Sequence, residues 1–143
     1  NPENFLPMTV KKILNAEKII IHGIKNGKVS SRCWIHAREV CNALVFLTKV
    51  GVVGESYNVV GEEKSVYDIA NKIAIAINNR PLEDKQVEWV DYHKQRPGHD
   101  LRYALSGEKL KKMGFVLRFT LDESFGRTVR WSIQSDNLRW LNL

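Results

Sequence analysis

The sequence has few cysteines and no long apolar run. Its two cysteines, Cys33 and Cys41, form no Cys-x-x-Cys pair and no Cys/His cluster with zinc spacing, so we expect no bound metal. The two lone thiols are expected to pack as small apolar side chains rather than to form a disulfide. No apolar stretch approaches the ~20 residues of a membrane-spanning helix, and no basic-then-apolar leader is visible. We therefore expect a cytoplasmic protein without a membrane contact.

The motifs that bind a nucleotide cofactor or carry a catalytic nucleophile are also missing. The chain contains no Gly-x-Gly-x-x-Gly or Gly-x-x-Gly-x-x-Gly turn, no P-loop and no Gly-x-Ser-x-Gly elbow. Its paired acids, Glu62-Glu63 and Asp122-Glu123, are expected at helix starts, where negative charge is favourable. With no self-sufficient catalytic set, this chain alone is expected to be inactive.

Basic residues exceed acidic ones, and the formal net charge is +6. Such a balance indicates an anionic partner, either nucleic acid, a phosphate ligand or a membrane surface. The lysines and arginines are spread along the whole chain, however, and no helix-turn-helix, zinc-finger or RNA-recognition pattern is present. Nucleic-acid binding would rest on net charge alone, so we do not expect it.

Short strands alternate with helices along the sequence. Residues 1–143 are therefore expected to form one small mixed α/β domain. Capping patterns at Ser65 (Ser-x-x-Asp) and Thr120 (Thr-x-x-Glu) predict two helix starts. The expected strands are residues 19–22, 32–36, 55–61 and 87–92, and the expected helices are residues 5–17, 37–50, 66–79, 107–113 and 121–134.

The stretch HKQRPGHDLRY, residues 93–103, concentrates basic side chains around a Pro-Gly turn. Such a turn presents its flanking side chains in a defined geometry. A guanidinium at Arg96 suits a diphosphate because its planar fork donates two parallel hydrogen bonds. His99 can add a donor to the same oxygens or to a ribose. The alternative is a surface ion pair of Arg96 with Asp91 or Asp100.

Two further positions are candidates for anion or ribose binding. Arg32 lies at a loop-to-strand junction, directly before the apolar stretch CWIH. Asn58 lies in YNVVG, near the end of an expected strand, and could bond a ribose or a phosphate. For Arg32 the alternative is again an ion pair with a nearby acid.

Five stretches resemble, in order, the C-terminal substrate-binding part of nucleotide-sugar 4,6-dehydratases of the dTDP-glucose or UDP-glucose type. These enzymes belong to the extended short-chain dehydrogenase/reductase family. The most specific match is QRPGHDLRYAL, which resembles the family's DRPGHD-x-RYA-I-D. The other four are NPENFLP, IIIHG followed by RCWIHAREVCNAL, GVVGESYNVVG, and KKMGFVLRFTLDESFGRTVRWSIQ.

The resemblance implies that this chain is one half of a larger enzyme and that the two halves have different functions. NAD, the catalytic Tyr-x-x-x-Lys pair and the acid/base carboxylates would belong to an N-terminal Rossmann half absent from this chain, and a partner domain is expected before Asn1. The whole enzyme, a homodimer, would oxidise C4 of the sugar, eliminate water across C5–C6 and return the hydride to C6. Arg32 and Arg96 would contact the diphosphate with Asn58 and His99 alongside, and Asn4, Phe5, Ile20 and His22 would line the nucleoside pocket.

Departures from the family pattern leave the choice between dTDP and UDP open. Asn4 replaces a lysine, and Cys33 and His36 replace the aspartate and tyrosine that usually follow Arg32. Two other readings also stay open: an epimerase or decarboxylase acting on UDP-sugars, and a non-catalytic binding or structural module derived from this domain.

Overall fold

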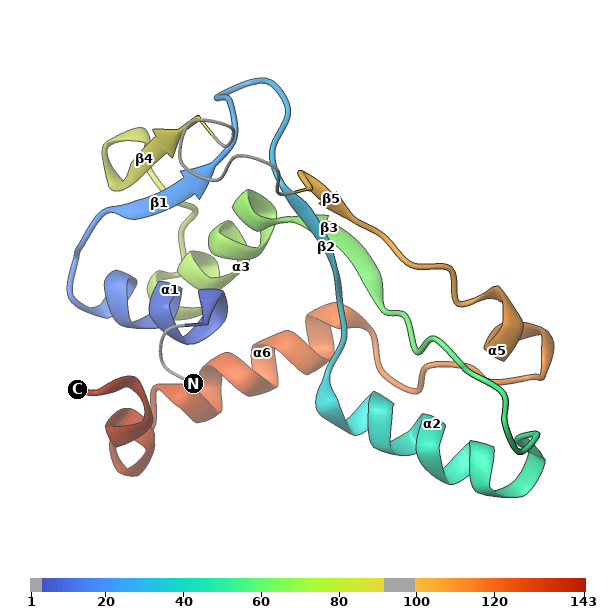
Figure 1. Ribbon diagram of the computed structural model, residues 1–143. Helices are drawn as coiled ribbons and strands as arrows, with labels where there is room; N and C mark the ends of the chain where they lie inside the picture. The colour runs from blue at the N-terminus through green and yellow to red at the C-terminus, as the bar shows by residue number, and fades with distance from the viewer. Residues whose placement is uncertain (1–3, 92–99) are drawn as a thin grey trace.

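A parallel pair of strands and the helices around it enclose the hydrophobic core of this computed structural model, which describes residues 4–91 and 100–143. Strands β1 and β4 pair in parallel, with Ile19 opposite Val87. Figure 1 shows the helices α1, α3 and α6 gathered below this pair. The elements are β1 (Ile19–His22), β4 (Val87–Val90), α1 (Phe5–Leu14), α3 (Val66–Asn78) and α6 (Leu121–Ser132).

A second, three-stranded sheet has β2 (Ser31–Trp34) at its centre. Strand β3 (Glu62–Ser65) runs antiparallel to β2, and the short strand β5 (Arg102–Tyr103) runs parallel to it on the other side. The register places Lys64 and Tyr103 opposite Arg32. Arg32 therefore lies in the middle of the sheet, which restricts where its side chain can reach.

Local capping explains where the principal helices begin. Ser65 and Asp68 form the predicted capping box of α3, and Thr120 and Glu123 form that of α6. Helix α2 (Ala37–Val50) begins after His36, whose Nδ1 accepts a hydrogen bond from the Arg38 amide at 3.0 Å. These bonds satisfy amide groups that have no partner inside the helix. The remaining elements are α5 (Glu108–Lys112) and the 3₁₀ helices η1 (Asp84–Gln86) and η2 (Ser135–Leu141).

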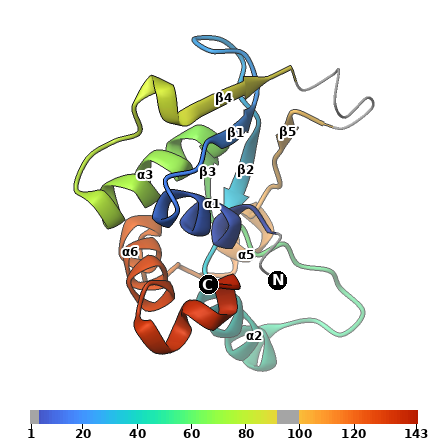
Figure 2. The same ribbon diagram turned by 90° about the vertical axis from the view of Figure 1, so that its left-hand side faces the viewer.

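One part of the molecule extends away from the core. We call residues 37–61 and 104–120 the arm; it holds α2, α5 and the segments that follow them. The arm contributes no residue to the hydrophobic cluster of the core. Figures 1 and 2 show α2 set apart from α1, α3 and the β1–β4 pair, at the far end of the molecule. The arm and the core meet along β2 and β3.

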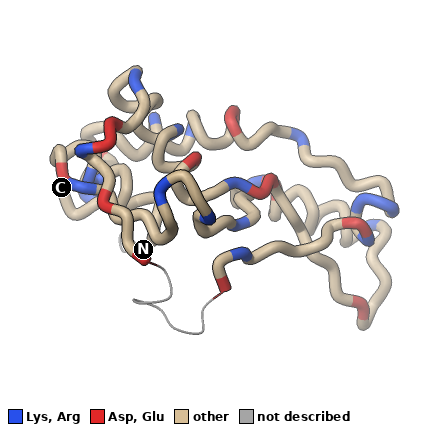
Figure 3. The backbone as a smooth tube through the Cα atoms, turned by 90° about the horizontal axis from the view of Figure 1, so that it is seen from above, with Lys and Arg blue, Asp and Glu red and all other residues tan. Residues whose placement is uncertain are grey.

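Charge is distributed over both parts. Figure 3 shows lysine and arginine interspersed with aspartate and glutamate along the whole backbone. Within residues 4–91 and 100–143, no helix is long and apolar enough to cross a membrane.

The expected helices are confirmed with small shifts at their ends, whereas the strands were predicted less well. The strand expected at 19–22 is confirmed, and the one expected at 87–92 forms β4, which ends at Val90. The strand expected at 32–36 forms one residue earlier and ends at Trp34. The strand expected at 55–61 is wrong: the chain forms β3 at Glu62–Ser65 instead. The prediction that Glu62 and Glu63 begin a helix is therefore also wrong. A Glu62 oxygen does accept from the Leu121 amide (3.2 Å), so it caps α6 from a distant strand.

Candidate functional site

Arg32 is fixed in place by backbone carbonyls and an aromatic ring. Its Nη1 donates to the carbonyl oxygens of Ser31 (2.6 Å) and Leu101 (3.1 Å). Its guanidinium carbon lies 4.4 Å from the centroid of the Tyr103 ring. Because Leu101 directly precedes β5 and Tyr103 lies in it, the arrangement depends on the pairing of β2 with β5 as well as on the neighbouring Ser31. Arg32 is half-buried, and its guanidinium orientation is set before any ligand arrives.

The charge of Arg32 is not neutralised by the parts of the chain that the structure describes. Within residues 4–91 and 100–143, no carboxylate forms an ion pair with it, so the alternative of a surface ion pair finds no support there. A guanidinium carries five N–H donors. Those of Nη1 are engaged, while Nε and Nη2 have no partner among the described residues. That edge offers the two parallel donors that a phosphate accepts.

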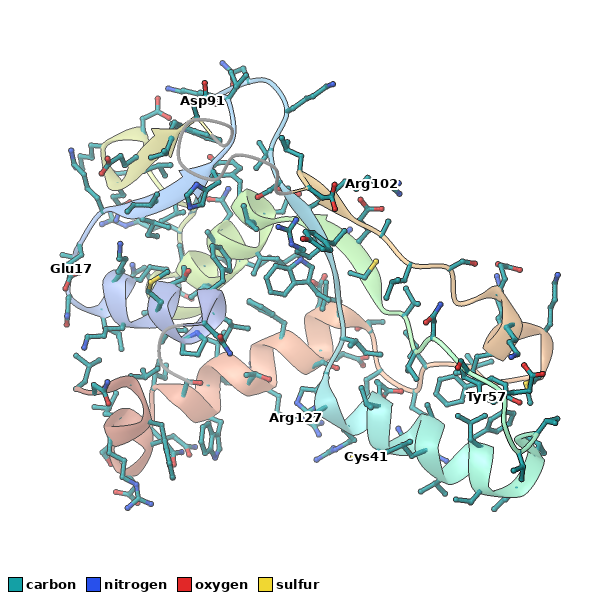
Figure 4. The ribbon with its side chains drawn as sticks, in the orientation of Figure 1. Glu17, Cys41, Tyr57, Asp91, Arg102 and Arg127 are labelled. Carbon is teal, nitrogen blue, oxygen red and sulfur yellow. The ribbon has the colours of Figure 1, made fainter. Side chains whose placement is uncertain are left out.

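The neighbouring Arg102 is neutralised in full. Its Nε and Nη2 donate to the two carboxylate oxygens of Glu63 at 2.8 and 2.7 Å, and the Ser31 hydroxyl donates to the same carboxylate at 2.7 Å. These bonds lower the pKa of Glu63 from 4.5 to about 2, with Arg102 the larger cause and Ser31 the next. The pair joins all three strands of the sheet, and Figure 4 shows Arg102 beside β5. Arg102 thus has a structural role.

Asn58 lies in the arm and not beside Arg32. Its side-chain amide donates to the Ser106 carbonyl at 3.3 Å. It lines a cavity of about 330 Å³ between the segment before β3 and helix α5, with Val60, Leu110 and Phe115 among the apolar neighbours. The structure therefore does not bring Asn58 and Arg32 together, and its role in binding stays a prediction.

The residues predicted to line a nucleoside pocket lie on α1 and β1. Asn4 precedes α1 and is exposed, without a side-chain capping bond. The Phe5 ring packs against Trp34, with 5.8 Å between centroids, and contacts the core. Ile20 is 37% exposed on β1, and His22 at the end of that strand is half-buried. Phe5 thus serves core packing in this structure, and Ile20 presents an apolar surface.

The two remaining predicted residues, Arg96 and His99, lie outside the described residues. The chain is described again from Asp100, and the Leu101 carbonyl accepts from the Ser31 amide at 2.9 Å. The sequence did not predict that the Tyr103 ring holds Arg32. Tyr103 lies in the same stretch as the predicted Arg96 and His99.

Both cysteines are free thiols. In the part of the chain that the structure describes, no group of three His, Cys, Asp or Glu could hold a metal ion.

Comparison with known proteins gives a consistent result. No protein-family model matches the chain. A dTDP-glucose 4,6-dehydratase of Xanthomonas campestris is 32% identical over 98% of this chain and 40% of its own. The structure of dTDP-glucose 4,6-dehydratase from Bacillus anthracis in complex with NAD has a TM-score of 0.79 and 28% identity, over 99% of this chain and 42% of its own.

A second solved structure agrees. DesIV, a dTDP-glucose 4,6-dehydratase from Streptomyces venezuelae with NAD and TYD bound, has a TM-score of 0.79 and 25% identity, over 98% of this chain and 41% of its own. The chain thus spans about 40% of the length of the relatives that it matches.

Proposed function

We propose that this chain binds the nucleotide diphosphate of a dTDP- or UDP-hexose. The chain belongs to the dTDP-glucose 4,6-dehydratase family and spans about 40% of the length of the relatives that it matches. One observation carries the proposal: Arg32 is held rigidly in the middle of β2, and an unpaired edge of its guanidinium remains available among the described residues. Charged hydrogen bonds from such a fork are short and strong. The Nε and Nη2 edge of Arg32 fits the diphosphate, which is the anionic part of a nucleotide sugar.

The other predicted residues complete the proposed site. Arg96 and His99 would add hydrogen-bond donors to the diphosphate, and Asn58 would act alongside them. The nucleoside would contact the surface that Ile20 and His22 present on β1, with Asn4 and Phe5 at the start of α1. Arg102 is excluded from this set because Glu63 already pairs with its charge and engages its Nε and Nη2.

The sequence contains no glycine-rich turn of the kind that binds the pyrophosphate of NAD. Its nine glycines are isolated, and none forms the glycine-rich turn that a dinucleotide pyrophosphate needs. NAD, bound by the portion of the relatives that this chain does not match, would accept and return the hydride in a whole dehydratase. The proposed task of this chain is to fix the diphosphate, a non-reacting part of the substrate. Binding energy gained there positions the hexose for reaction elsewhere.

The proposal is tested by titrating dTDP and UDP into the chain and following tryptophan fluorescence or NMR. We expect Arg32→Ala to weaken binding by about 1.5–3 kcal/mol, the value of a charged hydrogen bond. Arg32→Lys should recover part of the loss, since lysine keeps the charge but not the fork. Arg80→Ala is the matched control, because Arg80 is exposed, pairs with Glu83 and carries the same charge.

Equal affinity of wild type and Arg32→Ala would remove Arg32 from the site. If neither nucleotide binds to the chain, nor to the chain together with the portion it lacks relative to its homologues, the non-catalytic alternative is correct. A product that retains its 6-hydroxyl and differs at C4 alone would favour an epimerase.

A further inference from the structure

A polar pocket of about 410 Å³ lies where the loop after β1 meets the start of α3. Its walls come from that loop, from the first turn of α3, from η1 and from strand β4. Figure 1 shows the loop between β1 and β2 at the top of the molecule. The volume is within the range of pockets that hold small molecules.

The pocket lies on the other face of the β1–β4 pair from the surface proposed for the nucleoside. Side chains alternate between the two faces of a strand, so Ile20 faces away from the buried Ile19 and Ile21. Trp89, which lines the pocket, is opposite Ile21 in the register and packs against the core. A ligand in this pocket and a nucleoside on Ile20 would therefore not touch each other.

The loop that forms one wall is held at both its base and its tip. At the base, Gly23 and Val29 form an antiparallel bridge. At the tip, the Lys25 ammonium donates to the Asp84 carboxylate at 2.8 Å, which ties the loop to η1. Asn26 follows with a φ of 59°, a conformation that asparagine adopts more readily than most residues. This wall is thus in place before any ligand arrives.

The charged groups around the pocket already have partners. Lys25 and Asp84 neutralise each other. The Asp68 carboxylate accepts hydrogen bonds from the Ser65 hydroxyl at 2.7 Å and the Ser65 amide at 3.3 Å, as part of the capping box of α3. These bonds leave little attraction for a small ion.

The neutral groups of the pocket are uncommitted. The Tyr67 and Trp89 rings lie 5.2 Å apart between centroids, tilted by 41°, and both are half-buried. Within residues 4–91 and 100–143, no hydrogen bond engages the Tyr67 hydroxyl, the Trp89 Nε1–H or the Asn26 side-chain amide. An amide and a phenol both donate and accept, and an indole donates. The pocket therefore combines aromatic surface with free, uncharged hydrogen-bonding groups.

We propose that this pocket binds a neutral hexopyranose. The C–H face of a pyranose ring is apolar and stacks on aromatic rings, which offer an apolar face beside a polar handle. Its hydroxyls both donate and accept, as the free groups of Asn26 and Tyr67 do. A quaternary ammonium is the competing ligand, because aromatic rings attract it. The pocket takes no part in the proposed function, so the two are tested separately.

Titrating methyl α-D-glucopyranoside and methyl α-D-galactopyranoside into the 143-residue chain gives the first test, with the tryptophan indole N–H resonances followed by NMR. We expect at least one sugar to shift the Trp89 resonance with a Kd of about 1–10 mM, since one sugar ring makes few contacts. Trp131 and Trp140, which are 49% and 58% exposed outside the pocket, should not shift. Equal responses of all three, or none at Trp89, would overturn the proposal.

Two conservative variants give the second test. Asn26→Gly keeps the backbone conformation and removes the amide, and Tyr67→Phe keeps the ring contact and removes the hydroxyl. Each should weaken sugar binding by about three- to tenfold, the loss expected for one neutral hydrogen bond. Asn79→Gly is the matched control, because Asn79 also has a positive φ of 56° and lies beyond the end of α3, outside the pocket. Unchanged affinity in both pocket variants would refute the site.

Further titrations separate this site from other ligands and from the proposed nucleotide site. Choline chloride that shifts Trp89 where neither sugar does would assign the pocket to an organic cation. Saturating dTDP, and the Arg32→Ala change, should leave sugar affinity unaltered. Loss of sugar binding in either case would mean that the hexose occupies the proposed nucleotide-sugar site. Because the sugar shift is measured without nucleotide, failure of dTDP to bind would refute the proposed function alone.

Discussion

Arg32 and Arg102 lie on neighbouring strands and carry the same charge, but their surroundings give them different tasks. Arg102 and Glu63 form a two-point ion pair that holds three strands in register. Arg32 is held instead by neutral carbonyls and the face of Tyr103, so its charge is oriented without being cancelled. This difference gives Arg102 a structural role and supports the proposal that Arg32 binds an anion.

The Glu63 carboxylate makes stability depend on pH. Its pKa is about 2 in the folded chain against 4.5 as the ordinary value, because Arg102 and Ser31 bond to the charged form. A lowered folded-state pKa contributes stability that is present above pH 4.5 and is lost as the pH falls towards 2. Glu63→Gln should remove this dependence. Urea midpoints measured at several pH values between 2 and 5 check it, and parallel curves for the two proteins would contradict it.

A second carboxylate, that of Glu39, acts inside the arm. It is 2% exposed, and its oxygens accept from the Arg118 amide at 3.0 Å and the Asn42 side chain at 3.4 Å. Removing the carboxylate leaves the Arg118 amide without its acceptor. Glu39 therefore joins α2 to the segment that leads into α6.

We expect Glu39→Ala to destabilise the chain by about 1–3 kcal/mol, the cost of an unsatisfied buried donor. Glu39→Gln keeps an oxygen acceptor and should recover most of the loss. Equilibrium urea unfolding measures both. Glu88→Ala is the control, since Glu88 is exposed and should change stability by no more than about 0.5 kcal/mol. A loss no larger than the control's would show that the bond is dispensable.

At the scale of single residues, the sequence pointed to Arg32 as a candidate. It did not predict the ion pair of Arg102 with Glu63 or the buried bond of Glu39. Arginine at a loop-to-strand junction is visible in a linear pattern. The pairing of Arg102 with Glu63 is not, because the two are far apart in the chain and meet through the register of a sheet. Glu39 also escapes notice, since a glutamate on an amphipathic helix is usually solvated.

At the scale of helices and strands, the starts of helices are determined by nearby residues, whereas the strands depend on partners far away in the sequence. The capping residues Ser65 and Thr120 predicted the starts of α3 and α6 because each bonds within its own first turn. Strand β3, with the sequence EEKS, has no apolar alternation and was not predicted. It exists because β2 lies alongside it. The two-residue strand β5 was missed for the same reason.

The close approach of β2 and the segment before β3 depends on Gly61. A Cβ at this position would lie 1.9 Å from the Trp34 carbonyl oxygen, a backbone atom that cannot rotate away. We expect Gly61→Ala to cost about 1–3 kcal/mol through displacement of the strands. Thermal unfolding measures the loss. Ser56→Ala, an exposed change in the same segment, is the control, and an equal Tm for both variants would refute the steric reason.

As a whole, the molecule has one core and an arm without a core of its own. The described residues of α1, β1, α3 and α6 share a single apolar cluster, whereas α2 is held by the Glu39 bond, by Ala43 and by the contact of the Phe46 and Phe115 rings, 5.5 Å apart. Stability should therefore be uneven, since regions with few buried apolar contacts open first.

Native-state hydrogen exchange should reveal this difference. We expect amides of α2 to exchange through a local opening that costs less free energy than global unfolding. Amides near Ile69 and Ile73 in α3, which are fully buried, should exchange through global unfolding alone. Equal free energies for the two helices would mean that the arm unfolds together with the core.

The parallel pairing of β1 with β4 also bears on how the chain reaches this state. Ile19 and Val87 are neighbours in space but nearly half the chain apart in sequence. A ribosome would release β1 long before β4 exists, so this pair cannot form until the intervening chain, α3 included, has been synthesised. The β1–β4 pair then closes late, and contact order of this kind slows folding. Until that closure the backbone edge of β1 that pairs with β4 remains open, and an unpaired edge is prone to pair with another chain.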